Sequence, residues 1–363
     1  MLACERYRAP KKCVAVRDYL LPKAIFNQVA IPPTSAADRS PSEGTGISAL
    51  GYYLPPQERT IAELIASGQT DSSADKLAQL GFGSIRVACD ESAVQLAVQA
   101  VRDLQERSSF NLDQVDVLLY AGALATSSVV IDDDADAWNA LVDPLPLFRF
   151  PGTCLQSELG IPQASVIGVA QLACNTFQGT LRVARGLLMA EPSLKHVLCV
   201  AADRFPQRSK REIVYNLMSD GACAAVVSRR HPENRILSTV QITRGAYWDS
   251  SISHDQLIAA YFPLARRAIV EAVSGAGLTM GELDLLIPHN LNIKSWEILA
   301  QVIGMPLERI YTANIARVGH VVASDNIINY IDAFAQGRIL RGHKIAMFVM
   351  GFGAHWSCTV IEV

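Results

Sequence analysis

The sequence lacks the features that mark several classes of protein. Its eight cysteines form no Cys-x-x-Cys pair and follow no regular spacing, which disfavours a zinc ribbon or a disulfide framework and favours a reducing compartment. It contains no run of 18 apolar residues, so no membrane-spanning helix is expected. Charged residues make up only 18% of the 363 residues, the net charge is −3 and no long basic run occurs, so nothing favours a nucleic-acid partner. We expect no bound metal ion.

The first 45 residues also lack a long apolar segment. The opening, MLACERYRAPKKCVAVRDY, is interrupted by charge every few residues, which disfavours a secretory signal and favours a cytoplasmic protein without membrane association. The rest of this stretch is rich in proline, serine and charge, so we expect residues 1–45 to be an extension outside the core.

From Gly46 onward, short apolar runs alternate with stretches of helical periodicity, which is the pattern of an α/β fold. The expected strands are 47–53, 115–121, 196–202, 222–228, 283–288, 344–350 and 358–363. The expected helices are 93–106, 176–189, 256–274, 294–303 and 325–336, the last ending at Gly337. The chain also repeats itself weakly. We therefore expect an N-terminal half over 46–230 and a C-terminal half over 231–363, whose loops meet at a central cleft.

Four side chains are candidates for chemistry. Cys174 follows small and apolar residues and precedes a helical pattern; at a helix N-terminus the macrodipole and free N–H groups favour the nucleophilic thiolate, although a buried structural cysteine is the alternative. His289 follows the apolar run in LDLLIPHN and could be a general base, an oxyanion donor or an ordinary loop histidine. His320 lies in a loop that begins with glycine. Asp325 lies near a helix start, where it could simply cap the helix.

A glycine-bearing turn is expected between the last two strands, in MGFGAHWS. Backbone at such a turn can approach a ligand closely, so Gly353 is a candidate oxyanion contributor, with a plain hairpin as the alternative.

Six segments in order resemble the ketoacyl-ACP synthase III branch of the thiolase superfamily: GISALGYYLP, the Cys174 segment, LMSDGACAAVV, LIPHNLN, VGH and GFGAHWSCTVIEV. The resemblance implies a five-layered αβαβα fold of two similar halves that works as a homodimer. It implies acyl groups carried on the phosphopantetheine arm of acyl carrier protein (ACP) or coenzyme A, with no permanently bound cofactor. It further implies that Cys174 accepts the acyl group and His289 is the catalytic histidine, that Asn292 supports the site, and that Lys294 lies near the entrance of the arm.

The chain departs from this family at His320, where condensing members have asparagine. A decarboxylating condensation needs histidine and asparagine together to hold the thioester oxygen as CO2 leaves. If Asp325 reached His289, the two would form a Cys174–His289–Asp325 triad suited to activating a hydroxyl or amine. This pattern resembles a subset that transfers acyl groups to O or N acceptors. We therefore predict an acyltransferase with a small-molecule acceptor in secondary metabolism.

Other readings stay open. One is a decarboxylating β-ketoacyl synthase in which His320 donates the hydrogen bond of the missing asparagine; others are a non-catalytic partner subunit of a heterodimer and a cysteine hydrolase. The tryptophan and arginine that often clamp the coenzyme A adenine are not evident, so ACP and coenzyme A both stay open as carriers. Residues 130–152, which include Trp138 and Phe148, resemble an insertion that either reshapes the acyl pocket of the neighbouring subunit or adds dimer packing.

Overall fold

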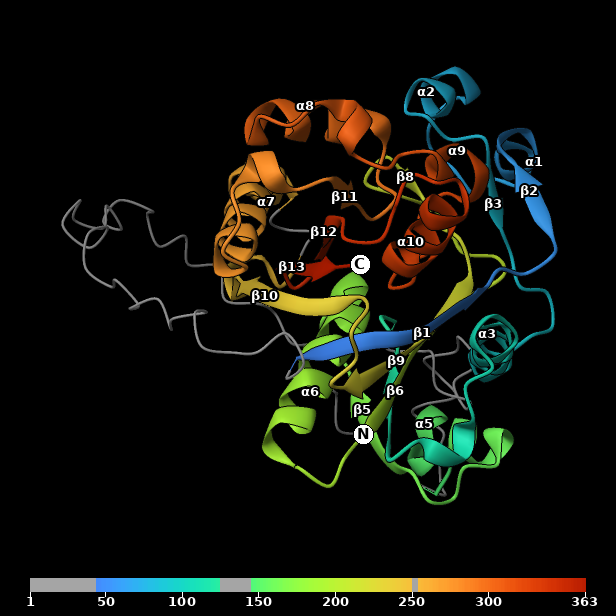
Figure 1. Ribbon diagram of the computed structural model, residues 1–363. Helices are drawn as coiled ribbons and strands as arrows, with labels where there is room; N and C mark the ends of the chain where they lie inside the picture. The colour runs from blue at the N-terminus through green and yellow to red at the C-terminus, as the bar shows by residue number, and fades with distance from the viewer. Residues whose placement is uncertain (1–43, 125–144, 250–253) are drawn as a thin grey trace, which may run out of the picture. The chain divides into compact units, whose positions relative to one another are not determined.

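The computed structural model describes residues 44–124, 145–249 and 254–363, and within these residues nine strands form one mixed sheet (Figure 1). The strand order is β11-β12-β13-β10-β1-β9-β6-β4-β5. The bounds are β1 Thr45–Tyr53, β4 Val117–Ala121, β5 Ser165–Val169, β6 His196–Asp203, β9 Gly221–Arg229, β10 Arg235–Thr243, β11 Leu285–Ile287, β12 Lys344–Gly351 and β13 His355–Glu362. Strand β4 is parallel to β5 and β6, and β11 is parallel to β12; the other neighbours are antiparallel.

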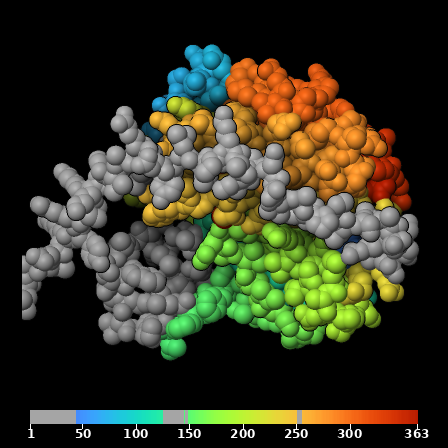
Figure 2. Space-filling view, turned by 90° about the vertical axis from the view of Figure 1, so that its left-hand side faces the viewer, coloured from blue at the N-terminus to red at the C-terminus, as the bar shows by residue number. Residues whose placement is uncertain are grey.

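Six helices complete a layered arrangement. Helices α3 and α5 pack on one outer face of the sheet, α7 and α8 pack on the other outer face, and α6 and α10 lie between the two halves of the sheet. Their bounds are α3 Ala93–Ser108, α5 Pro151–Leu159, α6 Thr176–Ala190, α7 His254–Gly275, α8 Ile293–Ile303 and α10 Asp325–Ala335. In Figure 2 the orange surface of α7 and α8 and the green surface of residues 150–190 occupy different parts of one face. The expected αβαβα order of layers is confirmed.

The central strands are buried on both faces, which explains their continuous apolar sequences. In β6, Val197 and Cys199 face the α6 and α10 layer, while Leu198 and Val200 face α3 and α5. A strand covered by helices on both sides has no polar face, so it reads as an unbroken apolar run rather than as an alternation. All the strands and helices expected from the sequence are present, with somewhat different ends. Helix α10 ends as expected before Gly337, whose φ is +70°.

The short elements of the first half pack with the second half. Leu64 of α1, Leu77 of α2 and Ile85 of β3 belong to the same apolar cluster as α7 and α8. The bounds of the short elements are β2 Glu58–Thr60, α1 Ile61–Ala66, α2 Ala74–Gln79, β3 Ser84–Arg86, β7 Glu212–Ile213, β8 Asn216–Leu217 and α9 Asn314–Val318. The division into 46–230 and 231–363 stays a prediction.

The expected N-terminal extension, residues 1–45, and the expected insertion, residues 130–152, lie mostly outside the described residues. Residues 1–43 and Trp138 are among those that are not described. Of the expected insertion, Leu145, Phe148 and Phe150 are described, and all three side chains are exposed at the surface.

Candidate active site

Cys174 lies in a tight turn that leads into α6. The turn is a 3-10 segment over Ala173–Asn175, and Gln171 and Ala173 on its approach have positive φ values of 66° and 47°. The thiol is buried but lines a cavity of about 360 Å³. Gly351 of β12 packs against the turn so closely that a Cβ atom there would lie 2.8 Å from the backbone nitrogen of Cys174. The expected position of the thiol, at the start of a helix, is therefore confirmed.

His320 joins Cys174 to Asp325. Its Nε2 atom lies 3.2 Å from Sγ of Cys174, and its Nδ1 atom makes a short hydrogen bond to Oδ2 of Asp325. The side chains of His320 and Asp325 are almost fully buried. Although burial disfavours the charged ring, the carboxylate of Asp325 and the sulfur of Cys174 favour it, and the net effect raises the pKa of His320 to about 10. These residues form a continuous thiol–imidazole–carboxylate chain.

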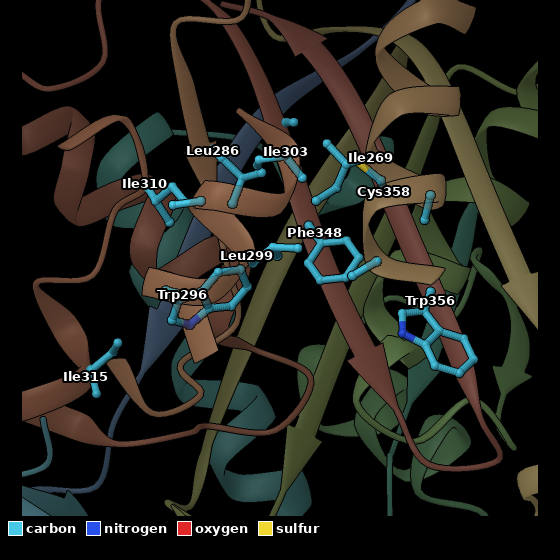
Figure 3. Packing of buried hydrophobic residues seen from close by; sticks show 14 of the residues in the cluster. Ile269, Leu286, Trp296, Leu299, Ile303, Ile310, Ile315, Phe348, Trp356 and Cys358 are labelled. Carbon is cyan, nitrogen blue, oxygen red and sulfur yellow. The ribbon is translucent and has the colours of Figure 1, made fainter. Parts of the chain in front are cut away.

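The expected pairing of Asp325 with His289 is wrong. Asp325 bonds to His320, and neither ring nitrogen of His289 has a hydrogen-bond partner. The ring of His289 is edge-on to Trp296, Phe348 and His320 at centroid distances of 5.4, 5.8 and 5.7 Å. Figure 3 shows Trp296 of α8 beside Phe348 of β12. Burial, together with the positive charge of His320, holds the pKa of His289 well below its usual range.

The cavity connects the buried pair to the surface. Cys174 and His320 line it together with the exposed side chains of Lys76, Tyr215 and Lys294, so its mouth lies near α2, α8 and the β7–β8 hairpin. Its wall is mostly apolar and includes Leu80, Ile213, Met218, Leu257, Phe262, Leu291 and Met350. Such a lining suits an extended apolar ligand. His289 is not among the lining residues.

The three supporting residues expected from the sequence take different places. Asn292 lines the cavity and caps α8, since its Oδ1 accepts from the backbone N–H of Ser295 at 3.1 Å. Lys294 lies at the mouth and pairs with Glu297 at 2.8 Å. Gly353 does not line the cavity; Gly351 and Phe352 of the same turn do.

Sequence reasoning missed His320 as the partner of the thiol. The signal was the His-Val-Val-Ala-Ser-Asp segment, which places the imidazole and the carboxylate on either side of a turn that opens a helix. Within the described ranges, no group of three or more His, Cys, Asp or Glu side chains could hold a metal ion. No helix in that part of the chain is both long and apolar enough to cross a membrane.

Two family models match the chain. The one described as 3-oxoacyl-[acyl-carrier-protein] synthase III matches residues 170–245, and the one for the C-terminal part of that synthase matches residues 273–363. A β-ketoacyl-[acyl-carrier-protein] synthase III of Aquifex aeolicus is 26% identical over 340 residues, which cover 88% of this chain and 99% of that protein.

Solved structures share the fold. The 3-oxoacyl-[acyl-carrier-protein] synthase III of Aquifex aeolicus has a TM-score of 0.75 at 22% identity, over 88% of this chain and 100% of its own. The acyltransferase ChlB3 has a TM-score of 0.74 at 21% identity, over 88% of this chain and 98% of its own. The priming β-ketosynthase of the R1128 polyketide pathway has a TM-score of 0.69 at 20% identity, over 90% of this chain and 98% of its own.

The chain is thus a ketoacyl-ACP synthase III-like protein of the thiolase superfamily. Enzymes of this family are acyl-group transferases whose substrates are thioesters of ACP or coenzyme A.

Proposed function

We propose that this protein is an acyltransferase that loads an acyl group onto Cys174 and passes it to a hydroxyl or amine of a small-molecule acceptor. The observation that carries this proposal is the Cys174–His320–Asp325 chain. Its imidazole is placed to exchange a proton with the sulfur, and its carboxylate fixes the tautomer and steadies the charged ring.

The proposed reaction has two half-reactions. In each of them His320 takes one proton and then returns it. His320 takes the thiol proton of Cys174, and the sulfur attacks the thioester carbonyl of acyl-ACP or acyl-coenzyme A. The leaving thiol takes that proton, and Cys174 keeps the acyl group. The acceptor then gives its proton to His320 and attacks the acyl-cysteine, and the released sulfur recovers the proton. We assign the oxyanion to backbone N–H groups near Cys174 and Gly351, because these two segments meet beside the thiol.

Two features disfavour decarboxylating condensation as the main activity. Both ring nitrogens of His320 are already engaged, one by Cys174 and one by Asp325. His289 is buried away from the cavity, beside aromatic rings. The pair of donors that would hold a malonyl thioester oxygen is therefore not assembled. Condensation is the second candidate, because the relative from Aquifex aeolicus is a β-ketoacyl synthase.

Intact-protein mass spectrometry tests the proposal. Wild type and Cys174→Ala are mixed with a panel of acyl-ACP and acyl-coenzyme A thioesters, and we expect an acyl adduct on the wild type that the variant does not form. Addition of hydroxyl or amine acceptors should then discharge it. Release of CO2 from a malonyl thioester with formation of a β-ketoacyl product would instead establish a condensing enzyme. Absence of any adduct would favour the non-catalytic subunit.

We also propose that the protein is a homodimer joined at the β5 edge of the sheet. Among the described strands β5 pairs with β4 alone, and its Ile167 is exposed, as are Phe148 and Phe150. An exposed apolar edge strand is a ready surface for pairing with a second chain. We expect Ile167→Lys to yield monomers in sedimentation equilibrium, whereas Val302→Lys, at an exposed position of α8, should leave the dimer intact. A dimeric Ile167→Lys protein would contradict this interface.

A further inference from the structure

Asp325 also accepts hydrogen bonds from groups other than His320. Its Oδ2 accepts the backbone N–H of Asn290 at 2.6 Å, and its Oδ1 accepts the backbone N–H of Val321 at 2.7 Å and the side-chain amide of Asn290 at 3.2 Å. Asn290 therefore contacts both carboxylate oxygens. Because the carboxylate is almost fully buried, the direction in which it faces His320 depends on these donors.

Asn290 is the first of three buried asparagines linked in series, which we call the asparagine chain. Its Oδ1 accepts from Nδ2 of Asn329 at 2.8 Å, and Oδ1 of Asn329 accepts from Nδ2 of Asn314 at 2.9 Å. All three side chains are buried. The chain ends at Asp332, whose Oδ2 accepts from Nδ2 of Asn314 at 2.8 Å.

The far end of the asparagine chain is an ion pair that reaches the surface. Asp332 pairs with the exposed Arg317 and also accepts the hydroxyl of Tyr52 at 3.0 Å. Arg317 donates from Nε to Oδ1 of Asn314 at 3.1 Å. The path from Asp325 to the surface thus runs through amide side chains only.

The ion pair at one end of the asparagine chain and the carboxylate of Asp325 at the other allow each amide only one orientation. A carboxylate can only accept and a guanidinium can only donate, so Asn314 must turn its NH2 group to Asp332 and its oxygen to Arg317. Asn329 then turns its oxygen to Asn314, and its NH2 group donates to Pro288 and to Asn290. Asn290 is left with its NH2 group facing Asp325, and reversing any of the three amides would bring two oxygens together.

The asparagine chain links segments that are distant in sequence. Asp325, Asn329 and Asp332 lie on α10 at spacings of four and three residues, which places them on one face of the helix. Asn314 and Arg317 lie on α9, and Asn290 lies in the loop after β11. The bonds therefore fix the loop that carries Asn290 against the helix that begins with Asp325.

We propose that Asn290 is a positioning residue, and that the asparagine chain lets the Arg317–Asp332 pair fix the orientation in which Asn290 holds Asp325 and, through it, His320. This inference rests on the proposed function, because it matters for catalysis only if His320 acts in acyl transfer. The geometry at His320 can be measured without any acyl substrate.

The test follows two signals in the full-length chain: the downfield proton resonance of the His320 Nδ1–H in 15N-histidine-labelled protein, and the rate at which iodoacetamide alkylates Cys174 at pH 7. In Asn290→Leu we expect the resonance to shift or broaden and alkylation to slow by about tenfold, the lower end of what loss of an orienting partner costs. Asp332→Leu should change both signals in the same direction by a smaller factor. Asp332→Asn should restore them, since Arg317 still donates to Oδ1 of Asn314, so the NH2 group of Asn314 still faces position 332 and is met there by the oxygen of the new amide.

Glu271→Gln is the matched control, because it breaks the exposed Arg267–Glu271 pair on α7 and should change neither signal. Unchanged signals in Asn290→Leu and Asp332→Leu would overturn the proposal. A change in Asn290→Leu without one in Asp332→Leu would keep Asn290 as a positioning residue and overturn the link to the surface. If Asn290→Leu does not fold, the two Asp332 variants decide the matter. A protein that passes this test but transfers no acyl group would refute the proposed function and leave the inference standing.

Discussion

Replacing His320 with alanine should slow acyl transfer by a factor between about 10² and 10⁴, the usual contribution of a positioned general acid–base. The variant keeps the Cys174 thiol and the cavity. It loses the imidazole that, in the proposed reaction, takes the proton from the sulfur and returns it to the leaving thiol. The measurement is the single-turnover rate of acyl-adduct formation and discharge, followed by mass spectrometry.

The matched control for this variant is His289→Leu. His289 does not line the cavity, and its two ring nitrogens are buried without partners, so we expect transfer to stay within a few-fold of wild type. The free energy of unfolding should be unchanged or higher by about 1 kcal/mol, because an unsatisfied buried polar group is removed. The opposite result, an inactive His289→Leu and an active His320→Ala, would restore His289 as the catalytic histidine.

Replacing Asp325 with asparagine should reduce the transfer rate by about 10⁴, as loss of the orienting carboxylate does in other triads. An asparagine at this position keeps one acceptor oxygen but carries no charge to stabilise the protonated ring. It can also turn its NH2 group toward His320, which selects the wrong tautomer. Normal transfer by Asp325→Asn would remove the carboxylate from the mechanism.

The same variant carries a pH signature in stability. The pKa of His320 is raised to about 10 in the folded protein, so its contribution to stability is full below the unfolded value of 6.5 and is lost as pH rises through about 10. In Asp325→Asn only the sulfur of Cys174 still opposes the effect of burial, so most of this contribution disappears. The difference in Tm between wild type and variant should therefore be largest near pH 6 and shrink toward pH 10. A difference that grows with pH would contradict the assignment of the charge to His320.

The sequence predicted the layers well because the central strands are covered on both faces. Strands such as β6 and β9 leave an unbroken apolar signature, and the helices between them show clear periodicity. Two strands gave no such signal. β10 is half-buried, so polar and apolar residues are mixed along it, and β5 is short, exposed and contains Gly168. Their place in the sheet is set by neighbours that are remote in the chain, which no local pattern reports.

The residues of the candidate site could be predicted from the sequence, but the histidine that contacts both Cys174 and Asp325 could not. Cys174, His320 and Asp325 could all be named from the sequence, but the choice between two histidines depends on where the main chain is anchored. The backbone N–H of His320 donates to Leu217 at 2.7 Å, and its carbonyl accepts from Ser219 at 2.8 Å. These partners lie about 100 residues earlier in the sequence. They place the ring of His320 next to the sulfur, and sequence spacing contains no information about them.

The apolar wall of the cavity has a consequence for the lifetime of the acylated enzyme. The approach to Cys174 is surrounded by leucine, isoleucine, methionine and phenylalanine side chains. Water finds few hydrogen-bond partners there, whereas a long thioester arm or an amphipathic acceptor makes apolar contacts with the wall. If Cys174 is acylated as proposed, we expect this exclusion of water to suppress hydrolysis of the acyl-cysteine. An acyl-cysteine formed without an acceptor should be long-lived enough to purify.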